Sequence, residues 1–217
     1  MCGIVAYIGR RQAAEILLEG LKRLEYRGYD SAGIALVQDG IEVYKVAGKV
    51  TDLEKKTQSH KKSGSIGMGH TRWATHGGPT DSNAHPHVDN DGKLAVIHNG
   101  IIENYGSLKQ ELIQKGYTFQ SQTDTEVLVN FIEDIQINNN SSLEEAMRIA
   151  LKRVVGAYVI IVMEEGFPDR LIAARKGSPL VIGVGDGEHF LASDASPIIE
   201  YTKKVIYVND YELAIIS

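Results

Sequence analysis

Cys2 is the only cysteine in the 217-residue chain, and it stands directly behind Met1. A thiolate is a strong nucleophile, and a free α-amine, with an unperturbed pKa of about 7.7–8.0, suits a general base near neutral pH. If Met1 is removed, one residue therefore carries both the nucleophile and its base. A small apolar residue at the start of a buried strand would occupy the same position, so Cys2 alone does not separate these two interpretations.

Three further segments hold groups that could surround such a nucleophile. Arg72, in the segment GHTRWATHG, offers a planar fork of donors for a carboxylate, and Trp73 beside it could supply apolar cover. The side-chain amide of Asn99 and the backbone N–H of Gly100 could together stabilise an oxyanion, although Asn-Gly is also a common turn signal. Asp124, in the segment SQTDTE, could bind an ammonium group or merely interact favourably with a helix N-terminus.

Histidines are concentrated in the same part of the chain, and they raise a different chemistry. Five of the seven lie between residues 70 and 98: His70, His76, His85, His87 and His98. The HPH segment resembles the spacing of metal ligands, so a zinc or manganese hydrolase is an alternative. The segment lies in a loop, however, and no helical H-E-x-x-H pattern accompanies it, which favours hydrogen-bonded structural histidines.

Hydrophobic periodicity predicts the elements that must position these groups. Strands are expected at residues 2–8, 34–37, 43–46, 65–70, 94–98, 157–163, 170–174, 180–184, 189–192, 205–208 and 212–216. Helices are expected at 12–26, 52–60, 102–115, 127–135 and 143–154, and TDTE forms a capping box in which Thr123 accepts the N–H of Glu126. One strand should end at His98, and Asn99 and Gly100 should then form a turn. Residues 71–92 should form a long loop. Without regular strand–helix–strand alternation, the pattern predicts an α+β protein with antiparallel sheets and helices packed against them.

Composition limits the class of protein. The net charge of −5 argues against a general nucleic-acid surface, and no run approaches the ~18 apolar residues of a membrane span. The first apolar run precedes its positive charges, which is the reverse of a signal peptide, and one cysteine cannot form an intrachain disulfide. We therefore expect a cytoplasmic protein without nucleic-acid or membrane partners.

Several segments resemble one family in order along almost the whole chain. MCGIVAYIG, LEYRGYDSAG, GHTRWATHG, NAHPHV, HNGIIENY, TDTE and ARKGSPLVIG are similar to the glutaminase domain of the glutamine–fructose-6-phosphate aminotransferases, the glucosamine-6-phosphate synthases. The resemblance implies a class II glutamine amidotransferase. Its fold would be a four-layer αββα N-terminal-nucleophile hydrolase sandwich with two mainly antiparallel sheets. It also implies L-glutamine as substrate, with no metal and no cofactor.

The resemblance assigns roles by motif position. Cys2 would be the nucleophile, Asn99 and Gly100 the oxyanion hole, Arg72 the group that grips the α-carboxylate of glutamine, and Asp124 the group that binds its α-ammonium.

Four further residues would complete the site that the resemblance implies. Thr75 and His76 would line the glutamine pocket, Trp73 would belong to a lid that shields ammonia, and Arg27 would lie near the nucleophile.

Length departs from the family. The family enzyme has a C-terminal isomerase half that binds fructose 6-phosphate, and 217 residues leave no room for it. We expect residues 1–217 to form a single glutaminase domain, monomeric in isolation, that hydrolyses glutamine once Met1 is removed. A glutamine-sensing module that binds without turnover remains an alternative.

Overall fold

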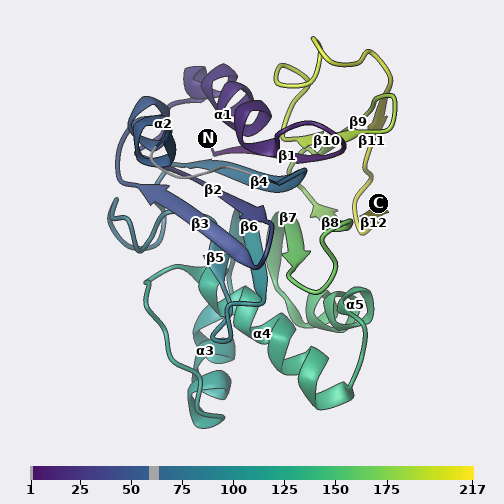
Figure 1. Ribbon diagram of the computed structural model, residues 1–217. Coiled ribbons are helices and arrows are strands. Elements are labelled where there is room, and N and C mark those ends of the chain that lie inside the picture. Colours follow the sequence, from purple (N-terminus) through teal and green to yellow (C-terminus); the bar gives the residue numbers. More distant parts are fainter. Residues whose placement is uncertain (1, 59–63) are drawn as a thin grey trace.

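Alternating apolar residues build two antiparallel sheets that face each other in the computed structural model, which describes residues 2–58 and 64–217 (Figure 1). The seven-stranded sheet has the order β11 (Val205–Tyr207), β9 (Val181–Val184), β10 (His189–Ala192), β1 (Gly3–Ile8), β4 (Ile66–Arg72), β2 (Ser31–Val37) and β3 (Ile41–Val46). The five-stranded sheet has the order β12 (Leu213–Ile216), β8 (Leu171–Lys176), β7 (Gly156–Glu164), β6 (Leu94–Ile102) and β5 (His87–Val88).

The period of two along each strand separates two faces, each with its own core. In β1, Ile4 and Ala6 point into the core between the sheets, whereas Val5 and Tyr7 point into the core beneath the helices. β7 repeats the pattern in the other sheet, because Ile161 packs between the sheets while its neighbours pack under the opposite helices. Three stacked cores therefore hold four layers together.

Helices form the two outer layers (Figure 1). The outer face of the seven-stranded sheet carries α1 (Ala13–Arg23) and α2 (Val50–Gln58), and the short 3-10 helix η1 (Glu25–Arg27) follows α1. α3 (Tyr105–Gln114), α4 (Asp124–Asn139) and α5 (Leu143–Arg153) form the layer on the five-stranded sheet. The expected α+β class with two antiparallel sheets is confirmed.

The main error in the expected elements concerns the turn at Asn99 and Gly100. β6 does not end at His98 but continues to Ile102, and it stays paired with β7 through Asn99 and Gly100. Elsewhere β2 begins at Ser31, three residues before the strand expected at 34–37, and β5 interrupts the long loop expected at residues 71–92. The last residues of the helix expected at 52–60 lie outside the described residues.

No helix within residues 2–58 and 64–217 is both long and apolar enough to cross a membrane.

Candidate active site

Strand alternation brings Cys2 and Asn99 to the same end of the core between the sheets. Cys2 lies two residues before Ile4, and Asn99 lies two residues after Ile97; both isoleucines belong to that core. Residues two apart in a strand point to the same face. The side chains of Cys2 and Asn99 therefore both point into the space between the two sheets, at the rim of the core.

β4 adds two more side chains to this rim. In the pairing of β1 with β4, Ile4 lies opposite His70, and Met68 of β4 belongs to the same core as Ile4. His70 and Arg72 continue the face of Met68 toward the end of the strand. Both are buried, with 0% and 3% of their surfaces exposed.

A cavity of about 330 Å³ opens at this rim, and it gathers six of the nine predicted site residues. Its lining comprises Cys2, Arg27, Trp73, Thr75, Asn99, Gly100, Ile101, Ser178, Pro179 and Ser193. A larger hollow of about 560 Å³ lies against α5, β8 and the start of β12, but none of the predicted groups lines it. The chemistry therefore points to the smaller cavity.

The Cys2 thiol accepts a hydrogen bond from the backbone, and its surroundings partly remove it from water. The backbone N–H of Trp73 donates to Cys2 Sγ over 3.2 Å. Burial nevertheless raises the pKa of the Cys2 thiol above its ordinary value. A thiol with a raised pKa is protonated at neutral pH, so Cys2 could act as a nucleophile only beside a base that takes its proton.

The backbone carbonyl of Cys2 is fixed from two sides. Arg27 Nη1 and Asn99 Nδ2 each donate to it over 3.2 Å. Arg27 is itself held by an ion pair of 2.6 Å to Asp194 and by a hydrogen bond to Ser193 Oγ. Arg27 therefore lies beside Cys2, and it orients the Cys2 backbone.

Gly100 occupies a place in β6 that only glycine fits. Its φ is +137°, and a β-carbon there would lie 2.0 Å from the carbonyl oxygen of Ala157 on β7. Any side chain would break the pairing of β6 with β7. The glycine thus keeps a regular strand running past Cys2.

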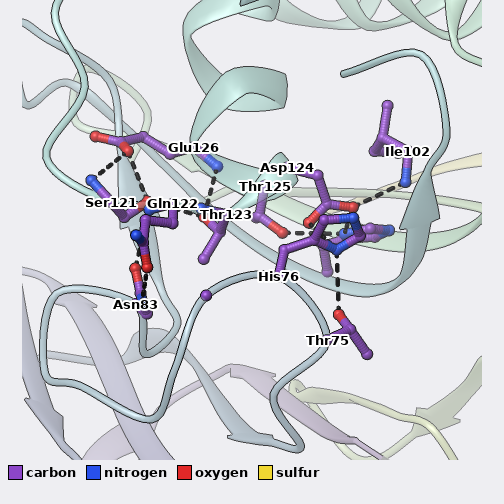
Figure 2. Close-up of polar contacts among 12 residues, drawn as sticks. Thr75, His76, Asn83, Ile102, Ser121, Gln122, Thr123, Asp124, Thr125 and Glu126 are labelled. Carbon is purple, nitrogen blue, oxygen red and sulfur yellow. Dashed lines mark hydrogen bonds and ion pairs between the residues drawn. The ribbon is translucent and has the colours of Figure 1, made fainter. Parts of the chain in front are cut away.

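Three predicted residues, Arg72, His76 and Asp124, do not line the cavity. Figure 2 shows His76 beside Asp124, which begins α4. Asp124 Oδ2 accepts the backbone N–H of Ile102 over 2.8 Å, and its Oδ1 is 4.0 Å from His76 Nδ1. Thr75 Oγ1 lies 3.3 Å from the same His76 nitrogen. The segment of residues 73–78 therefore connects Asp124 to the cavity.

The guanidinium of Arg72 is committed to that segment. It donates to the carbonyls of His76, Gly77 and Gly78. Burial lowers the pKa of Arg72, yet an arginine keeps its charge at neutral pH. A ligand carboxylate would have to compete with these carbonyls for the guanidinium.

One of the two hydrogen bonds of the predicted capping box is present at the start of α4. Thr123 Oγ1 accepts the N–H of Glu126 over 3.2 Å, as predicted. The Glu126 carboxylate accepts the N–H groups of Gln120 and Ser121 rather than that of Thr123. Figure 2 shows the contact with Ser121. The start of α4, and with it Asp124, is thereby anchored.

Four of the five histidines between residues 70 and 98 are buried, and His76 is partly exposed. His70, His85, His87 and His98 are all buried, and burial lowers the pKa of each. Across the part of the chain that the structure describes, no group of three or more His, Cys, Asp or Glu side chains could hold a metal ion. The metal-hydrolase alternative therefore lacks a ligand set there.

Sequence reasoning missed two residues that shape the cavity. Ser193, which lines it, accepts the N–H of Ile4 at its Oγ over 3.1 Å. Asp30 accepts the N–H of Ala74 over 2.6 Å, and its own N–H donates to the Arg72 carbonyl. Asp30 lies in the RGYDSAG segment, so the sequence could have marked it as a candidate. Nothing in the residues around Ser193 marks that position.

Known proteins match this chain in both sequence and fold. A glutamine amidotransferase domain model matches residues 53–215. The whole chain is 57% identical to glutamine–fructose-6-phosphate aminotransferase (isomerizing) of Bacteroides thetaiotaomicron and 52% identical to that of Pyrococcus horikoshii. It spans only 36% of the length of either relative.

Two solved structures share the fold over 99% of the chain. The first is glutamine phosphoribosylpyrophosphate amidotransferase from B. subtilis, with a TM-score of 0.81, 28% identity and 47% of its own chain covered. The second is described as the allosteric regulatory enzyme of purine biosynthesis, with a TM-score of 0.84, 29% identity and 46% of its chain covered.

Proposed function

This chain belongs to the glutamine amidotransferase domain family, and from that membership and the site geometry we propose that it hydrolyses the side-chain amide of L-glutamine with Cys2 as nucleophile. The observation that carries the proposal is the meeting of Cys2, Asn99 and Gly100 in one cavity. They come from two sheets, and together they supply a nucleophile and two candidate donors for an oxyanion.

The first half of the reaction forms a thioester. After removal of Met1, the α-amine of Cys2 accepts the thiol proton, and Sγ attacks the amide carbon of glutamine. Asn99 Nδ2–H and the Gly100 N–H stabilise the negative oxygen of the tetrahedral intermediate. The C–N bond then breaks, and the protonated amine gives its proton to the nitrogen, which leaves as ammonia.

The second half restores the enzyme. Water attacks the γ-glutamyl thioester and gives up a proton to the α-amine, and the same donors stabilise the second tetrahedral intermediate. The C–S bond breaks, Sγ regains a proton, and glutamate leaves. A thiol whose pKa is raised by burial fits this scheme, since the amine supplies the base that the thiol needs.

Substrate selection would use the two charges of an α-amino acid. Arg72 would bind the α-carboxylate after exchanging its contacts with the carbonyls of residues 76–78, and Asp124 would bind the α-ammonium. Thr75 and His76 would line the pocket between these charges, and Trp73, which is 55% exposed, would cover it. The substrate would thus draw the segment of residues 73–78 over itself.

In a longer form of the protein, the ammonia would serve a second reaction. The relatives are named as aminotransferases of fructose 6-phosphate, and they extend well beyond the length that this chain covers. We propose that a covalently linked isomerase half, binding fructose 6-phosphate, would consume the ammonia. The isolated chain, as a monomer, would release it to solvent.

The experiment measures glutamate release from glutamine by a chain whose loss of Met1 is verified by intact mass. Replacement of Cys2 by Ala should abolish release, while a chain that keeps Met1 should be almost inactive because its Cys2 nitrogen is an amide. Parent-like activity in Cys2→Ala would refute the mechanism. Calorimetric glutamine binding by the processed parent, without any glutamate formed, would instead support a sensing module.

A further inference from the structure

His70 touches the proposed oxyanion hole but is not part of it. It is fully buried on β4, beside the rim of the core between the sheets. His70 Nε2 lies 2.9 Å from Asn99 Oδ1 and 3.0 Å from the backbone carbonyl oxygen of His98. His70 does not line the cavity, so it can act on the reaction only through its neighbours. Of the two contacts above, only the one with the Asn99 side chain reaches a residue that lines the cavity.

The carbonyl of His98 settles which atom donates. A backbone carbonyl can only accept, so Nε2 of His70 must carry a hydrogen. That hydrogen is directed at Asn99 as well, and the Asn99 atom that faces it must therefore be the oxygen. The other ring nitrogen of His70, Nδ1, is buried and has no hydrogen-bond partner among the described residues, which fits a bare lone pair.

The orientation of the Asn99 amide follows from this polarity. With Oδ1 turned to His70, Nδ2 points to Cys2, where it donates to the Cys2 carbonyl over 3.2 Å. A rotation of the amide by 180° would place Nδ2 against the Nε2–H of His70 and Oδ1 against the Cys2 carbonyl. Both new contacts would be repulsive, and an oxygen would then face the developing oxyanion.

The His70 ring is itself held in place by packing. It stacks on His85, with ring centroids 4.2 Å apart and planes at 28°. The Nδ1 of His85 accepts the backbone N–H of His98 over 3.4 Å. β6 thus fixes the His70 ring in two ways. His98 holds the His85 ring on which His70 stacks, and the His98 carbonyl accepts the hydrogen of His70 Nε2.

We infer that His70 is a positioning residue, which holds the Asn99 amide with its N–H₂ toward Cys2 so that it can stabilise the oxyanion. This inference rests on the proposed glutamine hydrolysis and deepens it. The contribution falls on the transition state, because the ground-state substrate does not need the oxyanion donor. Loss of the His70 donor should therefore lower kcat for glutamine and leave KM nearly unchanged.

The test compares donor-free and donor-bearing replacements on the processed chain. His70→Phe and His70→Met remove the donor, and kcat should fall by about 10- to 100-fold, less than the ~10²–10³ expected for Asn99→Ala. His70→Gln keeps an N–H donor and should stay within several-fold of the parent. Tyr7→Phe is the matched control, since it removes a buried donor from β1 that bonds Glu188, away from the cavity.

A double-mutant cycle separates positioning from mere packing. If His70 acts through Asn99, the double variant His70→Phe/Asn99→Ala should have the kcat of Asn99→Ala alone. The inference would be overturned if the kcat losses of the two single variants multiplied in the double variant. It would also be overturned if a donor-free variant kept the parental kcat. Alkylation of Cys2 by iodoacetamide forms no oxyanion, so its rate should be unchanged in a folded donor-free variant; a large change would mean that the thiol itself had moved.

The two proposals fail in different ways. If the processed parent releases no glutamate while its Cys2 is still alkylated, the proposed function is wrong. The same cycle, measured on the free energy of unfolding by denaturant, then tests the His70–Asn99 contact by itself. Additive losses of stability would show that the contact does not exist in solution.

Discussion

At the scale of a single residue, Gly100 combines two constraints that a side chain would violate. Its backbone has a positive φ, and it lies against the Ala157 carbonyl on the neighbouring strand. Because that neighbour is backbone in the middle of a sheet, it cannot move aside cheaply. The donor proposed for the oxyanion therefore depends on the absence of a β-carbon.

Gly100→Ala should lower the free energy of unfolding by about 2–4 kcal/mol, since it adds both a clash and backbone strain. Thermal or denaturant unfolding measures this directly. Gly106→Ala is the matched control: a β-carbon there meets nothing within 4 Å and lies in α3, so stability should be unchanged or rise by up to ~1 kcal/mol. Equal effects of the two variants would contradict the argument.

The same residue shows what the sequence could predict of the site. Asn99 and Gly100 were recognised as candidate donors, but the dipeptide was expected to form a turn. Asn-Gly signals φ > 0 at the glycine, and that signal is identical whether the strand turns or continues beside a close carbonyl. Only the pairing with Val159 and Tyr158 distinguishes these outcomes, and that pairing joins segments about 60 residues apart.

At the scale of an element, α4 places the buried carboxyl group of Glu133 beside Asp89, which lies in the turn between β5 and β6. Glu133 and Asp89 are only 5% and 4% exposed. Burial, together with the nearby Asp89, raises the pKa of Glu133 to about 8. The unfolded chain releases this proton at an ordinary pKa near 4.3, so folding carries a cost that grows between these two values and is complete above pH 8.

Glu133→Gln should remove that cost. We expect the variant to be more stable than the parent by about 1 kcal/mol at pH 8 and equal to it near pH 4, as measured by denaturant unfolding at both values. The exposed residue Glu165 provides the control Glu165→Gln, which should change little at either pH. A gain at pH 4 that matches the gain at pH 8 would show that ionisation of Glu133 is not the cause.

Elements were predicted accurately where their own residues determine the local structure. The apolar run of β1, which is buried on both faces, and the capping box of α4 were both visible in the sequence. The start of β2 was missed because Ser31–Gly33 are small and polar enough to resemble a loop. Their place in the strand comes from pairing with β4, which no local pattern reports.

At the scale of the whole molecule, the burial of four histidines links the stability of the fold to pH. His70, with a pKa lowered to about 3, and His85, His87 and His98 all fold as neutral rings. Unfolded histidines have a pKa near 6.5, so below that value the unfolded chain binds more protons than the folded one. This contribution to stability is complete above pH 6.5 and is lost as the pH falls.

The free energy of unfolding should therefore fall steeply between pH 6.5 and pH 4.5, by up to about 1.4 kcal/mol per pH unit for each histidine that takes up a proton. Denaturant unfolding across this range, in the Glu133→Gln background, isolates the histidine effect. His189, which is partly exposed, supplies the control: His189→Gln should leave the slope unchanged. A flat profile would contradict neutral burial of the cluster.

Assembly of the site was beyond local sequence patterns. Cys2, Arg27, Trp73, Asn99 and Ser193 line one cavity, yet they are scattered over most of the chain. Spacing along the sequence carries no information about such distant neighbours. For the same reason the HPH spacing left a metal site open as an alternative to structural histidines. The family resemblance supplied the arrangement that periodicity could not.

The position of β1 has a consequence for how the chain is made. This strand is the fourth of seven in its sheet, flanked by β4 and β10, and β10 ends only at Ala192. β1 is synthesised before both of its partners, so the sheet cannot close on both sides of it until Ala192 has been synthesised. Cys2 thus acquires its final surroundings long after it has been synthesised, which leaves an interval during translation for the removal of Met1.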